Sequence, residues 1–212
     1  HYRENSYDTY VLSRNFLDNR SYKYQDNIEV DSLKTLDYRS QEAETKFRYE
    51  NTTRTNGYKI NAGLGLEYAN YTNETFRKSF INGQQVTIDY DSNLDLFKWS
   101  LFGQVSKSFF KEKLDLSLGF RTDANNYSAN MSNMLDQLSP RFSLSYKFIP
   151  KWSFNFNTGR YYQLPPYTTL GFSNASGELI NKQNNLKYIS ADHFVAGFQY
   201  LPNEQSKISI EG

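Results

Sequence analysis

The sequence contains no cysteine and only two histidines, His1 and His193. Without cysteine the chain has no disulfide framework and no thiol chemistry, which excludes a small disulfide-rich secreted scaffold. Two histidines without any thiolate also fall short of the ligand set of a transition-metal site. The sequence therefore predicts neither a metal nor any other cofactor.

An excess of one charge and a long apolar run are missing as well. Lys and Arg number 24 against 23 Asp and Glu, so the formal net charge is +1. A chain with so little net charge lacks the field that attracts nucleic acid. No segment approaches the ~20 consecutive apolar residues of a membrane helix. The mean hydropathy of −0.77 agrees with this, although membrane strands that alternate apolar and polar residues also give a low average.

Aromatic side chains are abundant where aliphatic ones are not. Apolar residues make up 38% of the chain, yet 17% of all residues are aromatic, with 18 Tyr and 16 Phe. A globular core of this size normally draws on more Val, Ile, Leu and Ala. The composition instead suits a barrel with a hydrated inside, an apolar outside and aromatic girdles.

The fold prediction depends most on the segment 139–163. Apolar and polar residues alternate through two arms, and a strand places successive side chains on opposite faces. Pro150 lies between the arms and cannot donate a ladder hydrogen bond, which is typical of a turn. The segment therefore predicts a β-hairpin with one apolar and one polar face. The apolar residues of its arms are Phe142, Leu144, Tyr146, Phe148, Trp152, Phe154 and Phe156.

The same period of two recurs along most of the chain. It predicts an all-β protein, an antiparallel up-and-down meander of about ten strands that forms part of a transmembrane β-barrel. The expected strands lie at 7–17, 22–30, 41–51, 57–71, 94–109, 114–128, the two arms of 139–163, 189–201 and 206–212.

The connections between these strands alternate in length. Outer-membrane barrels sort their connections in this way, with tight periplasmic turns and longer outside loops. A soluble barrel with an open mouth is the alternative, and it predicts apolar residues inside and polar residues outside. The short connections lie at 52–56, 110–113, 149–151 and 202–205, and the long ones at 72–93, 129–138 and 164–188.

Four runs occur in a fixed order: SPRFSLSYKF, WSFNFNTGRYYQLPPYTTLGF, LKYISADHFVAGFQYLP and KISIEG. Together they resemble the C-terminal barrel of the TonB-dependent outer-membrane receptors of Gram-negative bacteria, closely over 94–212 and weakly before that. The resemblance implies a barrel of about 22 strands around an N-terminal plug. It also implies that outside loops capture a nutrient and that TonB pulls on the plug to import it.

Several partners and a partial domain follow from this resemblance. It implies contact with outer-membrane lipid, with a nutrient such as a siderophore, glycan, peptide or vitamin, with the TonB complex through a plug, and with a surface lipoprotein. Because about ten strands are fewer than half of the expected set, residues 1–212 are expected to be a partial barrel without plug, signal peptide and remaining strands. The predicted function is TonB-dependent uptake, and an outer-membrane enzyme is the alternative.

The strongest candidate for ligand recognition is the stretch RYYQLPPYTTLGF at 160–172. Pro165 and Pro166 end the strand because proline cannot continue a ladder. The loop that follows is expected to display Tyr167 and Phe172 at the outside mouth, where aromatic side chains offer rigid contact area. The alternative is that these rings pack against a neighbouring segment. The candidate residues here are Arg160, Tyr161, Gln163, Tyr167 and Phe172.

Arg121 and Asp123 form a second candidate site. Alternation points both side chains into the lumen if the apolar face of their strand meets lipid. Solvation or contact with a plug is the alternative role. Asp192 and His193 offer no catalytic pair, because neighbouring residues of a strand point to opposite faces. His193 is therefore expected to be an interfacial residue, and the chain is not expected to be an enzyme.

Overall fold

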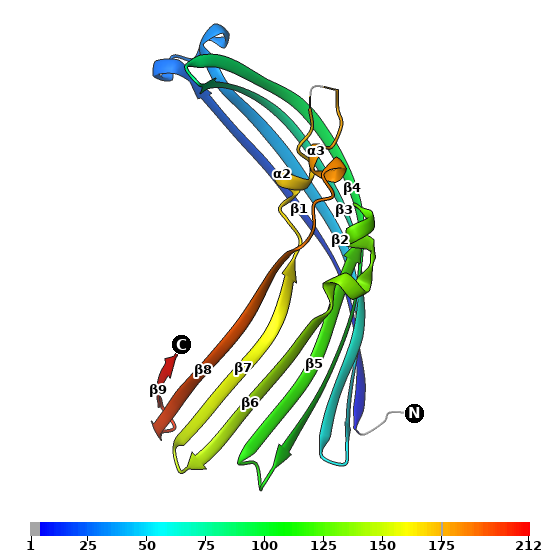
Figure 1. Ribbon diagram of the computed structural model, residues 1–212, viewed down its shortest axis with the longest axis vertical. Helices are drawn as coiled ribbons and strands as arrows, with labels where there is room; N and C mark the ends of the chain where they lie inside the picture. Colours follow the sequence, from blue (N-terminus) through cyan, green and yellow to red (C-terminus); the bar gives the residue numbers. More distant parts are fainter. Residues whose placement is uncertain (1–4, 175) are drawn as a thin grey trace.

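The computed structural model describes residues 5–174 and 176–212, so His1 lies outside the described residues. The strands form one nine-stranded antiparallel sheet in which each strand pairs with its neighbours in sequence (Figure 1). The all-β up-and-down meander is therefore confirmed. The strands are β1 (Ser6–Tyr24), β2 (Lys34–Thr55), β3 (Tyr58–Ile81), β4 (Gln84–Phe109), β5 (Leu114–Asn125), β6 (Ser139–Ile149), β7 (Trp152–Gln163), β8 (Ile189–Asn203) and β9 (Ser206–Glu211).

Six short helical segments lie in the connections, and none of the helices in the described part of the chain is long and apolar enough to cross a membrane. The segments are the 3-10 turns η1 (Gln25–Asn27), η2 (Asp31–Leu33) and η3 (Met134–Gln137) and the α-helical turns α1 (Ala129–Ser132), α2 (Tyr167–Leu170) and α3 (Ile180–Gln183).

Two Asn-Gly pairs close the longest hairpins. Asn56 and Gly57 join β2 to β3 with φ angles of 49° and 76°, and Asn82 and Gly83 join β3 to β4 with 52° and 79°. A two-residue hairpin turn with positive φ at both positions matches the right-handed twist of the flanking strands, and Asn-Gly adopts it at little cost. Each pair therefore fixes the register of a long, continuous ladder.

The structure corrects two of the expected segments. The expected loop 72–93 is instead the end of β3, the Asn82-Gly83 turn and the start of β4. The expected strand 22–30 is wrong beyond Tyr24, because Asp26 and Asn27 adopt positive φ and interrupt the ladder. In the described residues nine strands therefore replace the ten that were expected, and β1 to β4 extend well beyond the end of the β5 ladder (Figure 1).

The two faces of the sheet differ in chemistry. Cross-strand pairing puts Leu116, Leu144 and Phe156 side by side on one face, which we name the outer face. The opposite face, the inner face, carries Ser117 and Ser143 at the same height. Alternation along each strand continues this division through the rest of β5, β6 and β7.

Apolar side chains of the outer face are exposed rather than sealed in a core. Phe194 is 72% exposed and Ile210 is 77% exposed. Trp152 stacks on Tyr200 with ring centroids 4.6 Å apart, close to the short turns that follow β6 and β8. A soluble barrel would bury this set and expose the polar one, so the observed arrangement favours a lipid-facing outer surface with an aromatic girdle.

Four short turns lie at one end of the sheet, whereas the long connections and the Asn82-Gly83 turn lie toward the other (Figure 1). The turns after β2, β4, β6 and β8 gather at one end, and the segments 126–138 and 164–188 lie toward the other (Figure 1). These two segments fold onto the part of β3 and β4 that extends beyond the β5 ladder. The buried cluster there is Ala69, Tyr71, Leu94, Leu96, Tyr127, Met131 and Leu170.

Candidate functional site

The inner face carries Arg121 and Asp123, as the alternation predicted. The Arg121 Nε atom donates to Asp123 Oδ2 at 2.8 Å, and its Nη2 atom donates to Oδ1 at 2.6 Å. This two-point contact holds the guanidinium in one orientation. Arg121 therefore presents its remaining N–H groups to the space in front of the sheet.

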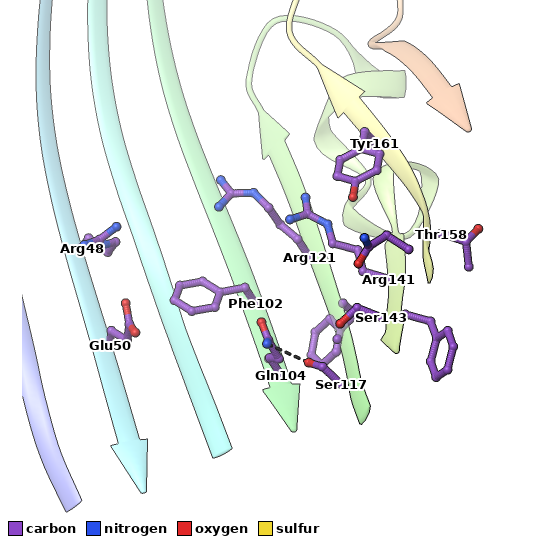
Figure 2. Close-up of a pocket in the computed structure, with 15 residues that line it drawn as sticks. Arg48, Glu50, Phe102, Gln104, Ser117, Arg121, Arg141, Ser143, Thr158 and Tyr161 are labelled. Carbon is purple, nitrogen blue, oxygen red and sulfur yellow. Dashed lines mark hydrogen bonds between the residues drawn. The ribbon is translucent and has the colours of Figure 1, made fainter. Parts of the chain in front are cut away.

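A cavity of about 420 Å³ lies against the inner face between β2 and β7. Arg48, Arg121 and Arg141 lie at its edge, and Phe102 lies between β2 and Arg121 (Figure 2). The Arg141 guanidinium lies 4.6 Å from the ring centre of Tyr161, within the range of a cation–π contact. We name this cavity, lined by these five residues, the arginine trough.

Glycines give the arginine trough its depth. Pairing sets Arg48 beside Gly65 and sets Arg141 between Gly119 and Gly159. At Gly159 the missing side chain leaves room for the stem of Arg141. A Cβ atom on Gly159 would lie 3.2 Å from Arg141 Cγ, so this position is nearly filled by the arginine itself.

A second cavity of about 410 Å³ adjoins the first, and Lys46, Glu67 and Lys98 from a cluster of alternating charges line it. Lys46 lies 2.6 Å from Glu44 and 3.6 Å from Glu67, and Lys98 contacts Glu67 directly and lies 3.6 Å from Glu44. The four side chains are 17% to 39% exposed. Because two lysines face two glutamates, the cluster is electrically balanced, and we name it the lysine–glutamate cluster.

Tyr167 connects the loop 164–188 to this cluster. Its hydroxyl donates to Glu44 and accepts from Lys98 Nζ at 2.6 Å, and its ring centre lies 5.9 Å from that of Tyr71. Burial, together with the hydrogen bond to Glu44, raises the pKa of Tyr167 well above its ordinary value, so the phenol stays protonated. Tyr167 thus packs against the wall, the alternative considered for the loop aromatics, and a contact with ligand stays a prediction.

We expect Tyr167→Phe to loosen the loop 164–188, because the change removes a hydroxyl bonded to two charged groups while it keeps the ring. Such bonds contribute about 1.5–3 kcal/mol. Hydrogen exchange of the Leu170 amide, which donates to the carbonyl of Pro166 just before α2, measures the loss.

Tyr188→Phe is the matched control for this change. The Tyr188 hydroxyl accepts from the uncharged Asn125 amide at 2.8 Å, so its loss is expected to cost only about 0.5–1.5 kcal/mol. Equal exchange rates in the two variants would show that the cluster does not hold the loop.

The remaining candidates lie in different places. Arg160 points to the outer face, where its Nε and Nη2 atoms donate to the two Asp192 oxygens at 2.7 and 2.9 Å. Gln163 ends β7 and is exposed. Phe172 is 41% exposed and contacts Tyr90, with ring centres 5.5 Å apart. Of the candidates, the structure brings Arg121 and Tyr161 together at one cavity and separates Arg160 from both.

The expected separation of Asp192 and His193 is observed. Asp192 pairs with Arg160 on the outer face, whereas the His193 ring lies 4.8 Å from that of Tyr161, an inner-face residue. The sequence analysis did not single out Arg48, Arg141, Phe102 or the lysine–glutamate cluster. The alternation of apolar and polar residues could have assigned these side chains to the inner face. Which of them lie close together depends on the register between strands, which the alternation does not specify.

A sequential antiparallel meander with an apolar outer face, a polar inner face and sorted connections defines part of an outer-membrane β-barrel. A comparison with family models then gives the particular family. The model described as TonB dependent receptor-like, beta-barrel matches residues 1–211, and the chain belongs to this family. TonB-dependent receptors lie in the outer membrane of Gram-negative bacteria and are receptors and transporters rather than enzymes, which agrees with the predicted class.

Solved structures share the fold at low identity. The ferric enterobactin receptor PfeA of Pseudomonas aeruginosa matches with a TM-score of 0.68 and 14% identity over 99% of this chain and 32% of that chain. The copper transporter OprC matches with a TM-score of 0.66 and 15% identity, over 92% of this chain and 33% of that chain. Pyoverdine-bound FpvA of P. aeruginosa matches with a TM-score of 0.64 and 10% identity, over 100% of this chain and 31% of that chain. The chain thus spans about a third of these proteins, and no curated protein matches its sequence.

Proposed function

We propose that the chain forms part of the wall of a larger receptor that takes up a nutrient across the outer membrane. The observation that carries this proposal is the polar inner face, hollowed by two cavities, behind an outer face that suits lipid. An inner face with charged and hydrogen-bonding side chains suits a hydrated passage. Family membership supports TonB as the partner, acting through a plug that the barrel encloses.

The printed names of the structural neighbours support small nutrients. OprC is a copper transporter, PfeA a ferric enterobactin receptor, and FpvA was solved with a ferric pyoverdine. The nutrient of this protein remains one of a siderophore, a glycan, a peptide or a vitamin. A surface lipoprotein is a further partner in this proposal.

Growth of the native bacterium on a panel of limiting nutrients tests the transport proposal. The panel contains ferric siderophores, oligosaccharides, peptides and corrinoids, each supplied as the only source of the limiting element or carbon. Deletion of the receptor gene is expected to abolish growth on one of them, and deletion of tonB is expected to abolish it equally. The intact receptor gene on a plasmid restores growth in the first strain only. Growth that survives the loss of TonB contradicts the proposal.

A further inference from the structure

The arginine trough has a floor as well as an edge. Pairing places Phe102 between Gly63 on β3 and Arg121 on β5, all on the inner face. A Cβ atom on Gly63 would lie 2.5 Å from Phe102 Cζ, so the ring covers the glycine. Gln104, Ser117 and Ser143 also line the cavity, so the Phe102 ring lies among hydrogen-bonding side chains.

Positive charge surrounds this ring on two sides. Among residues 5–174 and 176–212, no carboxylate lies within ion-pair distance of Arg48 or Arg141, whereas Arg121 is held by Asp123. Glu50 also lines the cavity, and its carboxylate accepts from Asn61 at 3.1 Å. Two guanidiniums are therefore without a carboxylate partner, and each presents a fork of N–H donors.

The combination of ring and guanidiniums selects a ligand chemistry. A carboxylate matches the guanidinium fork and accepts two parallel hydrogen bonds from it. A planar ring gains contact area from the Phe102 face and from Tyr161, which Arg141 already covers on one side. A neutral or nonplanar compound uses only part of this surface.

We propose that the arginine trough is a binding site for a planar ring compound that carries carboxylate groups. The inference rests on the proposed uptake function and names the chemical class that this part of the wall recognises. Arg48 and Arg141 bind the carboxylates from opposite sides, Arg121 is preoriented by Asp123, and Phe102 supports the ring. Electrostatic attraction by the unpaired guanidiniums also concentrates anions at the wall.

Calorimetric titration of the intact full-length receptor tests this proposal with three probes. Phthalate has the ring and two carboxylates, phthalamide is its neutral counterpart, and succinate is a dicarboxylate without a ring. Phthalate is expected to bind at least tenfold more tightly than either of the others. Equal binding of phthalate and phthalamide, or no binding of phthalate, overturns the proposal.

Variants assign the effect to named side chains. Arg48→Gln and Arg141→Gln are each expected to weaken phthalate binding by about tenfold or more, because each removes a charge-assisted contact. Phe102→Leu is expected to weaken phthalate binding about threefold or more and to leave succinate binding unchanged. Lys147→Gln, which makes the same charge change on β6 outside the trough, is the matched control and is expected to change nothing.

A second measurement separates ligand recognition from plug contact. If the arginines only hold an acidic part of a plug, Arg48→Gln and Arg141→Gln lower the thermal unfolding midpoint and leave phthalate binding unchanged, and the proposal fails. The transport proposal survives that outcome, because TonB-dependent growth on the native nutrient is measured independently.

Discussion

Leu144→Arg is expected to lower the free energy of unfolding of the membrane-embedded receptor by about 2–4 kcal/mol, the cost of an arginine on the lipid face near the bilayer midplane. Leu144 pairs with Phe156 on the outer face. Along β7 that height lies midway between Trp152, at the girdle near the turns, and the ion-paired Arg160. Urea titration of the full-length receptor in phospholipid vesicles measures the change, and heat-modifiable gel migration reports the folded fraction.

The neighbouring Ser143→Arg is the matched control. Ser143 lies one residue away on the inner face, where it lines the arginine trough and where a charge stays hydrated. Its replacement is expected to change the free energy of unfolding by less than about 1 kcal/mol. If the two arginines had equal effects, the outer face would not be the lipid-facing one.

Leu170→Ala is expected to detach the loop 164–188 from the wall. Leu170 is completely buried in the cluster that also contains Tyr71, Leu96 and Met131, and the Tyr127 hydroxyl donates to its carbonyl at 2.8 Å. Truncation of such a leucine costs about 2–5 kcal/mol through lost contacts and the cavity left behind. An opening made easier by 2 kcal/mol speeds amide exchange about 30-fold.

Exchange of the Leu186 amide, which donates to Asn181 within the same loop, reports this opening away from the substituted residue. Leu135→Ala is the control, because Leu135 is 78% exposed and its truncation leaves no cavity. It is expected to leave exchange in 164–188 unchanged. If the Leu186 amide of the Leu170→Ala protein exchanged as slowly as that of the unmodified protein, Tyr167 rather than the buried cluster would hold the loop.

Tyr127 and Tyr188 are neutral at physiological pH in this arrangement. Burial raises the pKa of each phenol to about 12. Their hydrogen bonds to the Leu170 carbonyl and from the Asn125 amide therefore persist across the neutral range. The increase in amide exchange expected for Leu170→Ala is thus the same across the physiological pH range, once the intrinsic pH dependence of exchange is taken into account.

The strands that cross the lipid were predictable, and those beyond it were not. In 139–163 one face meets hydrocarbon and the other meets water, so a period of two appears in the sequence. In 72–93 the projecting strands are rich in polar residues on both sides, and the period disappears although the ladder continues. The Asn82-Gly83 pair was the remaining signal of a hairpin there.

The sequence was sufficient to predict which face of the sheet each candidate side chain occupies, but not which side chains lie close together. Alternation was sufficient to place Arg121 and Asp123 together and to separate Asp192 from His193. The contact between Tyr167 and Glu44 joins residues 123 positions apart, and the trough joins β2 to β7. Such contacts depend on the register and curvature of the whole sheet, which local patterns do not specify.

The order β1 to β9 along the sheet also bears on how the wall assembles. Every ladder joins consecutive strands, so each docking event closes only the connection between two neighbouring strands and requires no search among distant segments. The Asn-Gly corners can form before the rest of the chain is in place. Biogenesis can thus add one hairpin after another, and a lesion in a late hairpin leaves the earlier ones able to pair.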